Sequence, residues 1–312
     1  MRIILIGGSG FIGKNLALKL SDLNYDVLIY DRQKPQFYNI NISNKVAYCM
    51  GDLSSQYMLE DILKEDDIVI HLISTSFPNN SNINIYMDAK SNILTGIMLI
   101  ETCIKRKVNK IIFASSGGAI YGPAQSVPLD EHHELNPISS YGIHKLVIEK
   151  YLELAHRLYG INTISLRIAN PYGQGQQPFK GQGFISTALA SVILNKKVQV
   201  WGDGNAIRDY IYIEDVCEAF CAAIKYDGEY SVFNIGSGIG HSINEILEII
   251  REIYNGEINI EYVNQTSAEV GKNILDCSRA AKILNWKSKT NFKYGIQMMF
   301  KTWDYKNEVF KF

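Results

Sequence analysis

A tyrosine and a lysine four residues apart form the part of this chain best suited to acid–base chemistry. Tyr141 and Lys145 lie in a segment whose apolar periodicity predicts a helix. A spacing of four places the phenol and the ammonium on the same helix face. A nearby ammonium lowers the pKa of a phenol, so Tyr141 could act as a base near neutral pH. The same spacing is common on surface helices where a tyrosine only packs, so the neighbouring segments must support the catalytic interpretation.

Hydroxyl groups follow the apolar strand predicted before this helix. The segment 113–122 reads FASSGGAIYG, which places Ser115 and Ser116 at the end of that strand. Parallel α/β sheets bind their ligands at the carboxyl edge formed by such strand ends. Asn92 lies on the preceding predicted helix, where it could fix the geometry of the site or hold a water molecule. These neighbours favour a catalytic interpretation of the Tyr–Lys pair.

A glycine-rich turn near the start of the chain predicts a nucleotide site. The run GGSGFIG at 7–13 follows an apolar strand and opens an apolar helix. Residues this small let the turn close and let backbone N–H groups approach a pyrophosphate. The predicted dinucleotide contacts in this turn are Gly7, Gly10, Phe11, Ile12 and Gly13.

Two acidic residues after the next strands could bind the adenosine half of the dinucleotide. Asp31 ends the second predicted strand, where a carboxylate accepts hydrogen bonds from the ribose hydroxyls and repels a 2′-phosphate. NAD is therefore favoured over NADP, although the adjacent Arg32 means that NADP is not excluded as the cofactor. Asp52, followed by Leu53, could lie near the adenine amino group or could instead cap the next helix.

Strand-like runs alternate with helical patterns in the first half of the chain. The predicted strands are 2–6, 26–30, 46–49, 68–73, 110–115 and 162–168, and the predicted helices are 11–22, 55–63, 88–105 and 141–158. Several of these strands are almost continuously apolar, as strands covered on both faces are. The alternation predicts an α/β fold with a Rossmann-type, doubly wound parallel sheet.

The second half changes character after a loop at 170–178 that is rich in Gly, Pro and Gln. The elements predicted beyond it are a helix at 183–194, an extended run at 207–213, a helix from Glu214, a strand at 232–235, a helix at 243–254 and a strand at 258–263. We expect a smaller C-terminal α/β lobe packed on the first. Residues 1–167, with about 207–236, would bind NAD, and residues 168–206 and 237–312 would bind the substrate.

Composition excludes several classes of partner. The 312 residues carry 31 basic and 32 acidic side chains, so the net charge of −1 gives no general attraction to nucleic acid or to an anionic membrane. The five cysteines are scattered and form no metal-ligand pattern with histidine, so reduced thiols and no metal are expected. With neither a signal peptide nor an apolar run of about 18 residues, we expect a cytoplasmic protein without an integral membrane segment.

Taken together, these segments resemble the extended short-chain dehydrogenases/reductases that act on nucleotide sugars. The matching features are the glycine turn, Asp31, the segment 115–122, the Tyr141–Lys145 pair, and the later segments 167–173, 202–210 and 273–276. They occur in order over nearly the whole chain. The resemblance is strongest to UDP-glucose 4-epimerase-like proteins of the NAD-dependent epimerase/dehydratase family.

The resemblance implies NAD-dependent inversion at C4 of a nucleotide-diphosphate hexose, UDP-glucose or UDP-galactose or their N-acetyl forms. Tyr141 would take the C4 hydroxyl proton while a hydride passes to the nicotinamide. Lys145 would lower the tyrosine pKa and hold the nicotinamide ribose. Asn170 and Arg208 match positions that bind the substrate diphosphate. Relatives pair as homodimers through the helices that correspond to 88–105 and 141–158.

Three positions depart from the pattern of these relatives. Gly117 lacks the hydroxyl that most relatives place there, and Ser116 is the predicted replacement, because Ser115 should point to the other sheet face. Thr266 stands where an arginine usually helps to hold the nucleotide, which implies weaker UDP binding or a polyprenyl-diphosphate carrier. Asn273 is smaller than the tyrosine often found beside the C2 substituent of the sugar, which favours N-acetylhexosamines.

Other functions remain to be weighed. Dehydratases and decarboxylases of this superfamily need an acidic residue where this chain has Ala119, so elimination is disfavoured. A 4-ketosugar reductase would use the same tyrosine and lysine, but it usually prefers NADPH, which Asp31 opposes. A non-catalytic NAD-binding module remains an alternative, because Gly117 lacks the hydroxyl that most relatives have there.

Overall fold

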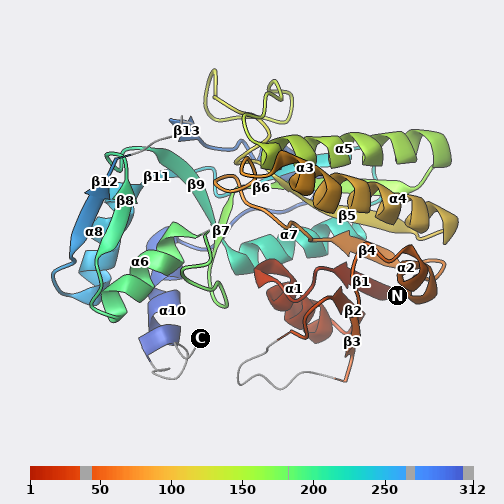
Figure 1. The fold of residues 1–312 in the computed structure, drawn as a ribbon, viewed down its shortest axis with the longest axis horizontal. Coiled ribbons are helices and arrows are strands. Elements are labelled where there is room, and N and C mark those ends of the chain that lie inside the picture. Colours follow the sequence, from red (N-terminus) through yellow and green to blue (C-terminus); the bar gives the residue numbers. More distant parts are fainter. Residues whose placement is uncertain (36–43, 182, 265–270, 305–312) are drawn as a thin grey trace.

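The computed structural model describes residues 1–35, 44–181, 183–264 and 271–304 (Figure 1). Its largest sheet has seven parallel strands, in the spatial order β10 (Val232–Ile235), β6 (Asn162–Ile168), β5 (Lys110–Ser116), β4 (Ile68–His71), β1 (Arg2–Ile6), β2 (Asp26–Asp31) and β3 (Val46–Met50). The strand order reverses between β1 and β4, which creates the switch point where doubly wound sheets bind ligands. The predicted Rossmann-type fold is confirmed.

Helices cover both faces of this sheet, which explains why its central strands are apolar along their whole length. One face carries α2 (Gln56–Ile62), α4 (Thr95–Lys105) and α5 (Ser140–Tyr159), and the other carries α1 (Phe11–Asp22) and α7 (Ile213–Lys225) (Figure 1). Each face has its own buried hydrophobic cluster, with Leu99 and Ile148 in one and Leu16 and Phe220 in the other. The sheet is therefore shielded from water on both sides.

A smaller lobe is built from short strands and four helices. The strands are β7 (Asn170–Tyr172), β9 (Ile207–Tyr212), β11 (Gly240–Ser242) and β13 (Lys272–Asn273) in one sheet, with β8 (Val198–Trp201) and β12 (Ile260–Val263) in another; the helices are α6 (Phe184–Ile193), α8 (Ile243–Tyr254), α9 (Ser278–Ile283) and α10 (Phe292–Asp304). Leu189 of α6 and Ile246 of α8 belong to the same buried cluster as Leu16 of α1. One hydrophobic core therefore continues from the large sheet into the small lobe.

The segment 207–236 is divided between the two sheets. Strand β9 pairs with β7, β11 and β13 of the small lobe, whereas β10 pairs with β6 of the large sheet and α7 packs against α1. We propose that the NAD-binding lobe comprises residues 1–167 with α7 and β10. In this division, residues 207–212 lie with the substrate-binding lobe, because their backbone hydrogen bonds are made there.

The helix expected over 88–105 is not uniform. It starts with α3 (Ile85–Asp88), continues as a π-helical segment η1 (Ala89–Leu94) and becomes regular only in α4. In η1 the Asn92 side chain bonds to Thr75 N at 2.9 Å and to Thr75 Oγ1 at 2.8 Å, so the widened turn is tied to the loop after β4. Single π-turns are frequent at functional sites. The helix predicted over 88–105 is therefore present, and its first part is π-helical where Asn92 bonds to the loop after β4.

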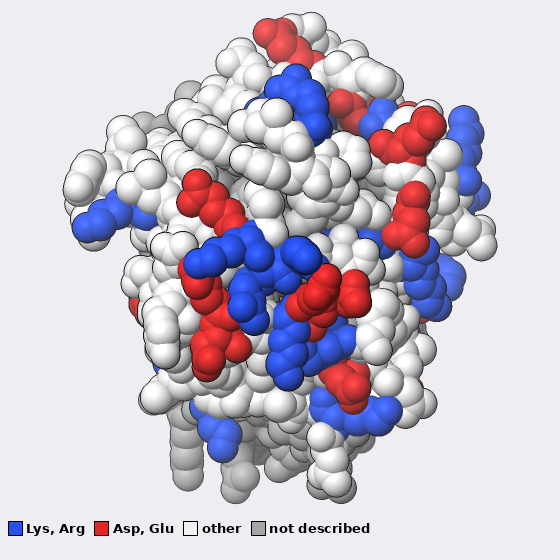
Figure 2. All heavy atoms as spheres, turned by 90° about the vertical axis from the view of Figure 1, so that its right-hand side faces the viewer, with Lys and Arg blue, Asp and Glu red and all other residues white. Residues whose placement is uncertain are grey.

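The surface beside the N-terminal edge of the large sheet carries basic and acidic side chains in alternation (Figure 2). The basic cluster at 105–107 is balanced by acidic neighbours: Lys105 Nζ lies 2.8 Å from Glu60 Oε2, and Lys107 Nζ lies 3.8 Å from Glu65 Oε1. Among the described residues, no helix is both long and apolar enough to cross a membrane.

Candidate active site

The glycine turn lies at the switch point, between β1 and α1. Gly7 has φ +83°, a conformation that L side chains rarely adopt. A Cβ on Gly13 would come within 2.5 Å of Gly8 Cα, so only glycine lets α1 pack this tightly against the turn. A Cβ on Gly10 would meet nothing closer than Gly7 O at 3.5 Å, so nothing crowds the start of α1 at this residue. A glycine turn at a helix N-terminus, with its backbone N–H groups, fits a dinucleotide pyrophosphate. The predicted contacts Phe11 and Ile12 follow as the first residues of α1, both half-buried.

Asp31 faces this turn from the end of β2. Its Oδ2 accepts a hydrogen bond from Ser9 N at 3.0 Å, and its Oδ1 accepts one from Gln33 N at 3.2 Å. The carboxylate is therefore fixed beside the glycine turn, as binding of the adenosine ribose requires.

Asp52 lies at the end of the neighbouring strand β3. Its Oδ1 accepts from Ser54 N at 2.8 Å, its Oδ2 is 3.9 Å from Arg32 Nη1, and the N-cap of α2 is Ser55. The alternative that Asp52 itself caps α2 is therefore wrong. That Asp52 lies near the adenine amino group of the dinucleotide stays a prediction. The adjacent Leu53 is buried beneath it.

Tyr141 and Lys145 lie on the first two turns of α5, close to the end of β5. Lys145 Nζ donates to Ala114 O at 2.8 Å and lies 5.6 Å from the centroid of the Tyr141 ring. Burial lowers the pKa of Lys145 to about 7, against the opposing charge of Glu149. Burial raises the pKa of Tyr141 to about 12, although a hydrogen bond with Ser116 lowers it. The pKa of Tyr141 is therefore raised, against the lowering that was expected from Lys145.

The two serines at the end of β5 have different environments. Ser115 Oγ donates to Glu149, whose carboxylate also pairs with the buried Arg167, so Ser115 is occupied within the core. Ser116 is the serine whose hydroxyl lowers the pKa of Tyr141. The structure thus brings Tyr141, Ser116 and Lys145 together at the carboxyl edge of the sheet, beside the glycine turn.

Packing explains why residue 117 is glycine. A Cβ there would lie 2.5 Å from Leu275 Cδ1 and 3.0 Å from Arg167 O. A serine could not enter without moving the leucine or the backbone of β6. A hydroxyl-bearing side chain at position 117 would therefore require Leu275 to shift.

Three predicted substrate residues lie on neighbouring strands of the small lobe. Asn170 on β7 donates through Nδ2 to Asp209 O at 2.9 Å, and Arg208 on β9 is in register with Asn273 on β13. Asn273 is buried, and its Nδ2 donates to Gly117 O at 3.0 Å. This bond joins the small lobe to the residue that directly follows β5. Thr266 lies outside the described residues.

Asp209 is a residue beside the candidate site that the sequence analysis did not single out. Its buried carboxylate accepts from Ser237 N at 2.8 Å, Gly238 N at 3.1 Å and Leu275 N at 3.3 Å. Asp209 thereby fixes the strand that carries Arg208 against the segments that carry Ser237 and Leu275. A lone acidic residue inside an apolar strand was the available signal. Within the described residues, no group of three or more His, Cys, Asp or Glu side chains could hold a metal ion.

Comparison with known proteins agrees with this geometry. A family model described as the NAD dependent epimerase/dehydratase family matches residues 3–236. The chain belongs to this family. NAD is thus the cofactor of this chain, and the glycine turn and Asp31 fit it.

Relatives of known name cover almost the whole chain. A protein of Methanocaldococcus jannaschii with the provisional name UDP-glucose 4-epimerase is 37% identical over 95% of this chain and 96% of its own length. A dTDP-4-dehydro-6-deoxyglucose reductase of Escherichia coli is 32% identical, covering 96% of each chain. The crystal structure of UDP-glucose 4-epimerase with UDP-glucose from Thermotoga maritima superimposes with a TM-score of 0.91 at 33% identity, covering 98% of this chain and 99% of that one.

Proposed function

We propose that this chain is an NAD-dependent 4-epimerase of a UDP-linked hexose. The observation that carries the proposal is the meeting of Tyr141, Ser116 and Lys145 at the carboxyl edge of the sheet, next to the glycine turn. The similarity to the Thermotoga maritima enzyme, which was solved with UDP-glucose, supports the choice of a UDP sugar.

In this reaction Tyr141 accepts the proton of the C4 hydroxyl while a hydride leaves C4, and it returns the proton to the same oxygen after the 4-keto sugar has turned over and the hydride has returned to the other face of C4. Ser116 bonds the same C4 oxygen and holds it in line with the phenol. Lys145, buried beside the phenol ring, stabilises the phenolate by its charge. Bound NAD supplies a hydride acceptor that is regenerated in each turnover, because the hydride returns to the sugar.

Residues of the small lobe hold the substrate. Arg208 and Asn170 bind the diphosphate, since a guanidinium gives charge-assisted bonds to phosphate oxygens. The small Asn273 leaves space beside C2 of the sugar, so N-acetylhexosamines are accepted with glucose and galactose forms. Because Thr266 stands where relatives usually have an arginine, a sugar linked to polyprenyl diphosphate is the alternative substrate.

A 4-ketosugar reductase is the second candidate, because the Escherichia coli relative at 32% identity bears a reductase name. Such an enzyme would use Tyr141 as the acid that protonates the new hydroxyl. It would also consume one reduced cofactor for each sugar, whereas an epimerase consumes none.

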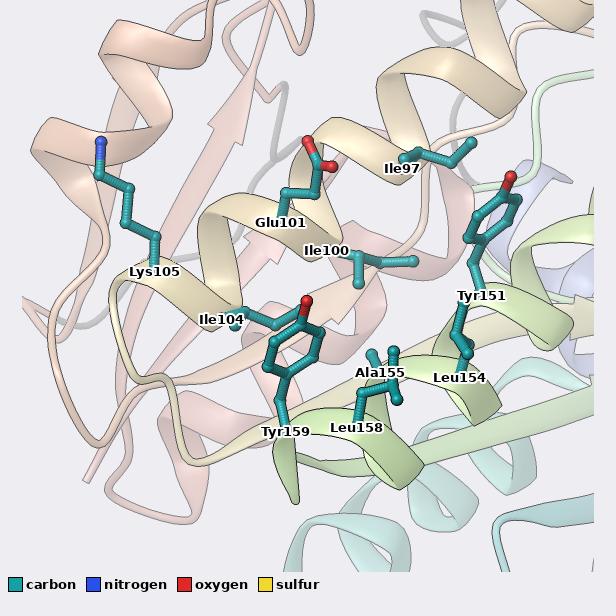
Figure 3. A pocket seen from close by; sticks show the side chains of 10 residues that line it. All are labelled: Ile97, Ile100, Glu101, Ile104, Lys105, Tyr151, Leu154, Ala155, Leu158 and Tyr159. Atoms are coloured by element: carbon teal, nitrogen blue, oxygen red, sulfur yellow. The ribbon is translucent and has the colours of Figure 1, made fainter.

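We further propose a homodimer formed through α4 and α5. The outer surfaces of these helices enclose a groove of about 400 Å³, and Figure 3 shows its lining of aliphatic and tyrosine side chains together with Glu101 and Lys105. Leu158 and Tyr159 are more than half exposed there. A second copy placing the same two helices in this groove would complete a four-helix bundle with two-fold symmetry. A cytoplasmic location belongs to the same proposal and is supported by the five free cysteines, all within the described residues.

The test is incubation of the purified protein, without added cofactor, with UDP-glucose, UDP-galactose and their N-acetyl counterparts, followed by NMR of the products. Conversion in both directions supports a 4-epimerase with resident NAD. Tyr141→Phe should abolish the conversion and leave NAD bound, and retained activity would rule out Tyr141 as the base. Conversion that requires added NAD(P)H in equal amounts would identify the reductase.

A further inference from the structure

A buried carboxylate behind the catalytic helix has no role in the mechanism above. Asp88 ends α3, and its Oδ2 accepts from Ser140 Oγ at 2.6 Å and lies 3.1 Å from His144 Nδ1. Its Oδ1 accepts from Ser76 Oγ and, at 3.0 Å, from Asn92 Nδ2. Burial alone would raise the pKa of Asp88, but the bonds from Ser140, Ser76 and His144 outweigh it and lower the pKa. The group is therefore an anion held by four donors.

Two of these donors flank the catalytic tyrosine on α5. Ser140 directly precedes Tyr141, and His144 follows it by three residues, which is the spacing of neighbours on a helix face. The backbone N–H groups of Ser140 and Tyr141 also donate to Asn82 Oδ1 at 2.8 Å and to Ser81 Oγ at 3.0 Å. N–H groups in the first turn of a helix have no partners within the helix, so side chains of the 81–88 segment fix the turn that carries the tyrosine.

His144 links this anion to the phenol ring. The carboxylate partner requires the proton on Nδ1, and burial together with the charge of Lys145 lowers the pKa of His144 to about 4, so the ring is neutral at neutral pH. The imidazole meets the Tyr141 ring edge-on, with centroids 5.1 Å apart. The ring is therefore held between Asp88 and the phenol. Its Nε2 is buried and has no hydrogen-bond partner among the described residues.

We propose that Asp88 and His144 are positioning residues that orient the phenol of Tyr141 toward Ser116 and the substrate C4 hydroxyl. The proposal rests on the 4-epimerase function above. A proton transfer requires the two oxygen atoms to be within about 3 Å, and a displacement of about 1 Å costs up to roughly 100-fold in rate. Without the Asp88–His144 bond, the first turn of α5 keeps its backbone bonds but loses the side-chain contact that orients the phenol.

The test compares three variants with the unaltered holoenzyme. His144→Leu removes the bond to Asp88, and Asp88→Asn removes the charge at constant shape. His144→Asn retains an amide donor close to the position of Nδ1. We expect His144→Leu and Asp88→Asn to lower kcat about 10- to 100-fold, with KM and the content of resident NAD within about 3-fold, and His144→Asn to recover most of the rate. His156→Asn is the control, because this histidine lies exposed on the same helix and contacts Ile161 O.

Several outcomes would overturn the positioning role. One is an unchanged kcat in His144→Leu or, should that variant not fold, in Asp88→Asn. A second is an equal loss in His144→Leu and His144→Asn, since the hydrogen bond would then be irrelevant. If the unaltered protein converts no UDP sugar, the proposed function fails separately. Crystal structures of the unaltered and variant proteins then decide, and an unchanged distance between Tyr141 Oη and Ser116 Oγ would reject the proposal.

Discussion

At the residue scale, the active site depends on which hydroxyl can reach the phenol of Tyr141. Leu275 fills the space that a side chain at Gly117 would need, and Ser115 is bonded to Glu149. Ser116 is left as the hydroxyl at the end of β5 that lowers the pKa of Tyr141. Its role is therefore a consequence of packing by residues from the small lobe and from α5.

Ser116→Ala should lower kcat by about 10- to 10⁴-fold, because the C4 oxygen loses its second hydrogen bond during proton transfer. NAD content should not change. Steady-state kinetics with a UDP hexose measures the effect. Ser115→Ala is the comparison variant, and measuring its folding separates a loss of catalysis from a loss of structure. A Ser116→Ala enzyme with the full rate would assign the role to another group.

Lys145 makes the stability of the chain depend on pH. Its folded pKa of about 7 lies below its ordinary value of 10.5, because burial disfavours the ammonium. Between these values the unfolded chain binds more protons at this site than the folded one, so the contribution of Lys145 to stability rises with pH. Its cost is fully present below about pH 7 and disappears towards pH 10.5.

Lys145→Met should therefore stabilise the nucleotide-free protein most below about pH 7, and the gain should shrink as the pH rises. Urea denaturation from about pH 6 to about pH 10 measures this difference. Lys150→Met, at an exposed lysine on the same helix, should show no such trend. A gain that is independent of pH would contradict the inferred pKa.

At the scale of secondary-structure elements, a buried lysine joins the start of β5 to the end of α7. Lys110 Nζ donates to Ile224 O at 2.9 Å and to Tyr226 O at 2.7 Å, and it pairs with Asp227 Oδ1 at 2.9 Å. A cation at this end of a helix satisfies carbonyl groups that have no partner within the helix and complements the helix dipole. Lys110 thus fixes α7 against the large sheet, far from the catalytic edge.

Lys110→Met should cost about 1–3 kcal/mol of stability, because the carbonyl oxygens of α7 lose their donor. The rate of the folded enzyme should not change, since β5 carries Lys110 and Ser116 at opposite ends. Urea denaturation measures the loss, and Lys107→Met, at an exposed lysine, is the control. A loss no larger than that of the control would show that the bonds of Lys110 contribute nothing net.

At the scale of the whole molecule, the apolar groove between α4 and α5 needs an explanation, because soluble proteins rarely leave such surface open to water. Filling it with a second copy would bury Leu158 and Tyr159 and would place a dimer interface directly behind the helix that carries Tyr141. Association would then also stabilise the catalytic helix.

Leu158→Arg should convert a dimer into a monomer, because a charge would have to be buried in the groove. Light scattering after size-exclusion chromatography measures the molar mass. Leu23→Arg is the control, since this leucine is partly exposed at the end of α1 on the opposite face of the sheet. A monomeric unaltered protein, or a dimeric Leu158→Arg variant, would refute the interface.

Local patterns in the sequence were sufficient for much of the fold and for the elements that carry the candidate site. Hydrophobic runs predicted β1, β6 and β10 with the bounds found, and the glycine turn and the Tyr141–Lys145 spacing predicted their elements correctly. These features depend on residues within one turn or one strand, where backbone geometry alone sets the distances.

The remaining features depend on contacts between residues far apart in the chain. The exclusion of a side chain at Gly117 by Leu275, the bond between Asp88 and His144, and the seating of Lys110 on α7 each join elements that the tertiary fold brings together. The π-turn at Asn92 has the same origin, since its bonds reach Thr75. Periodicity and spacing report which face of an element is buried but not which residue lies opposite. Local sequence patterns therefore indicate the kind of chemistry, whereas packing between distant residues decides which side chains lie at the site and how they are oriented.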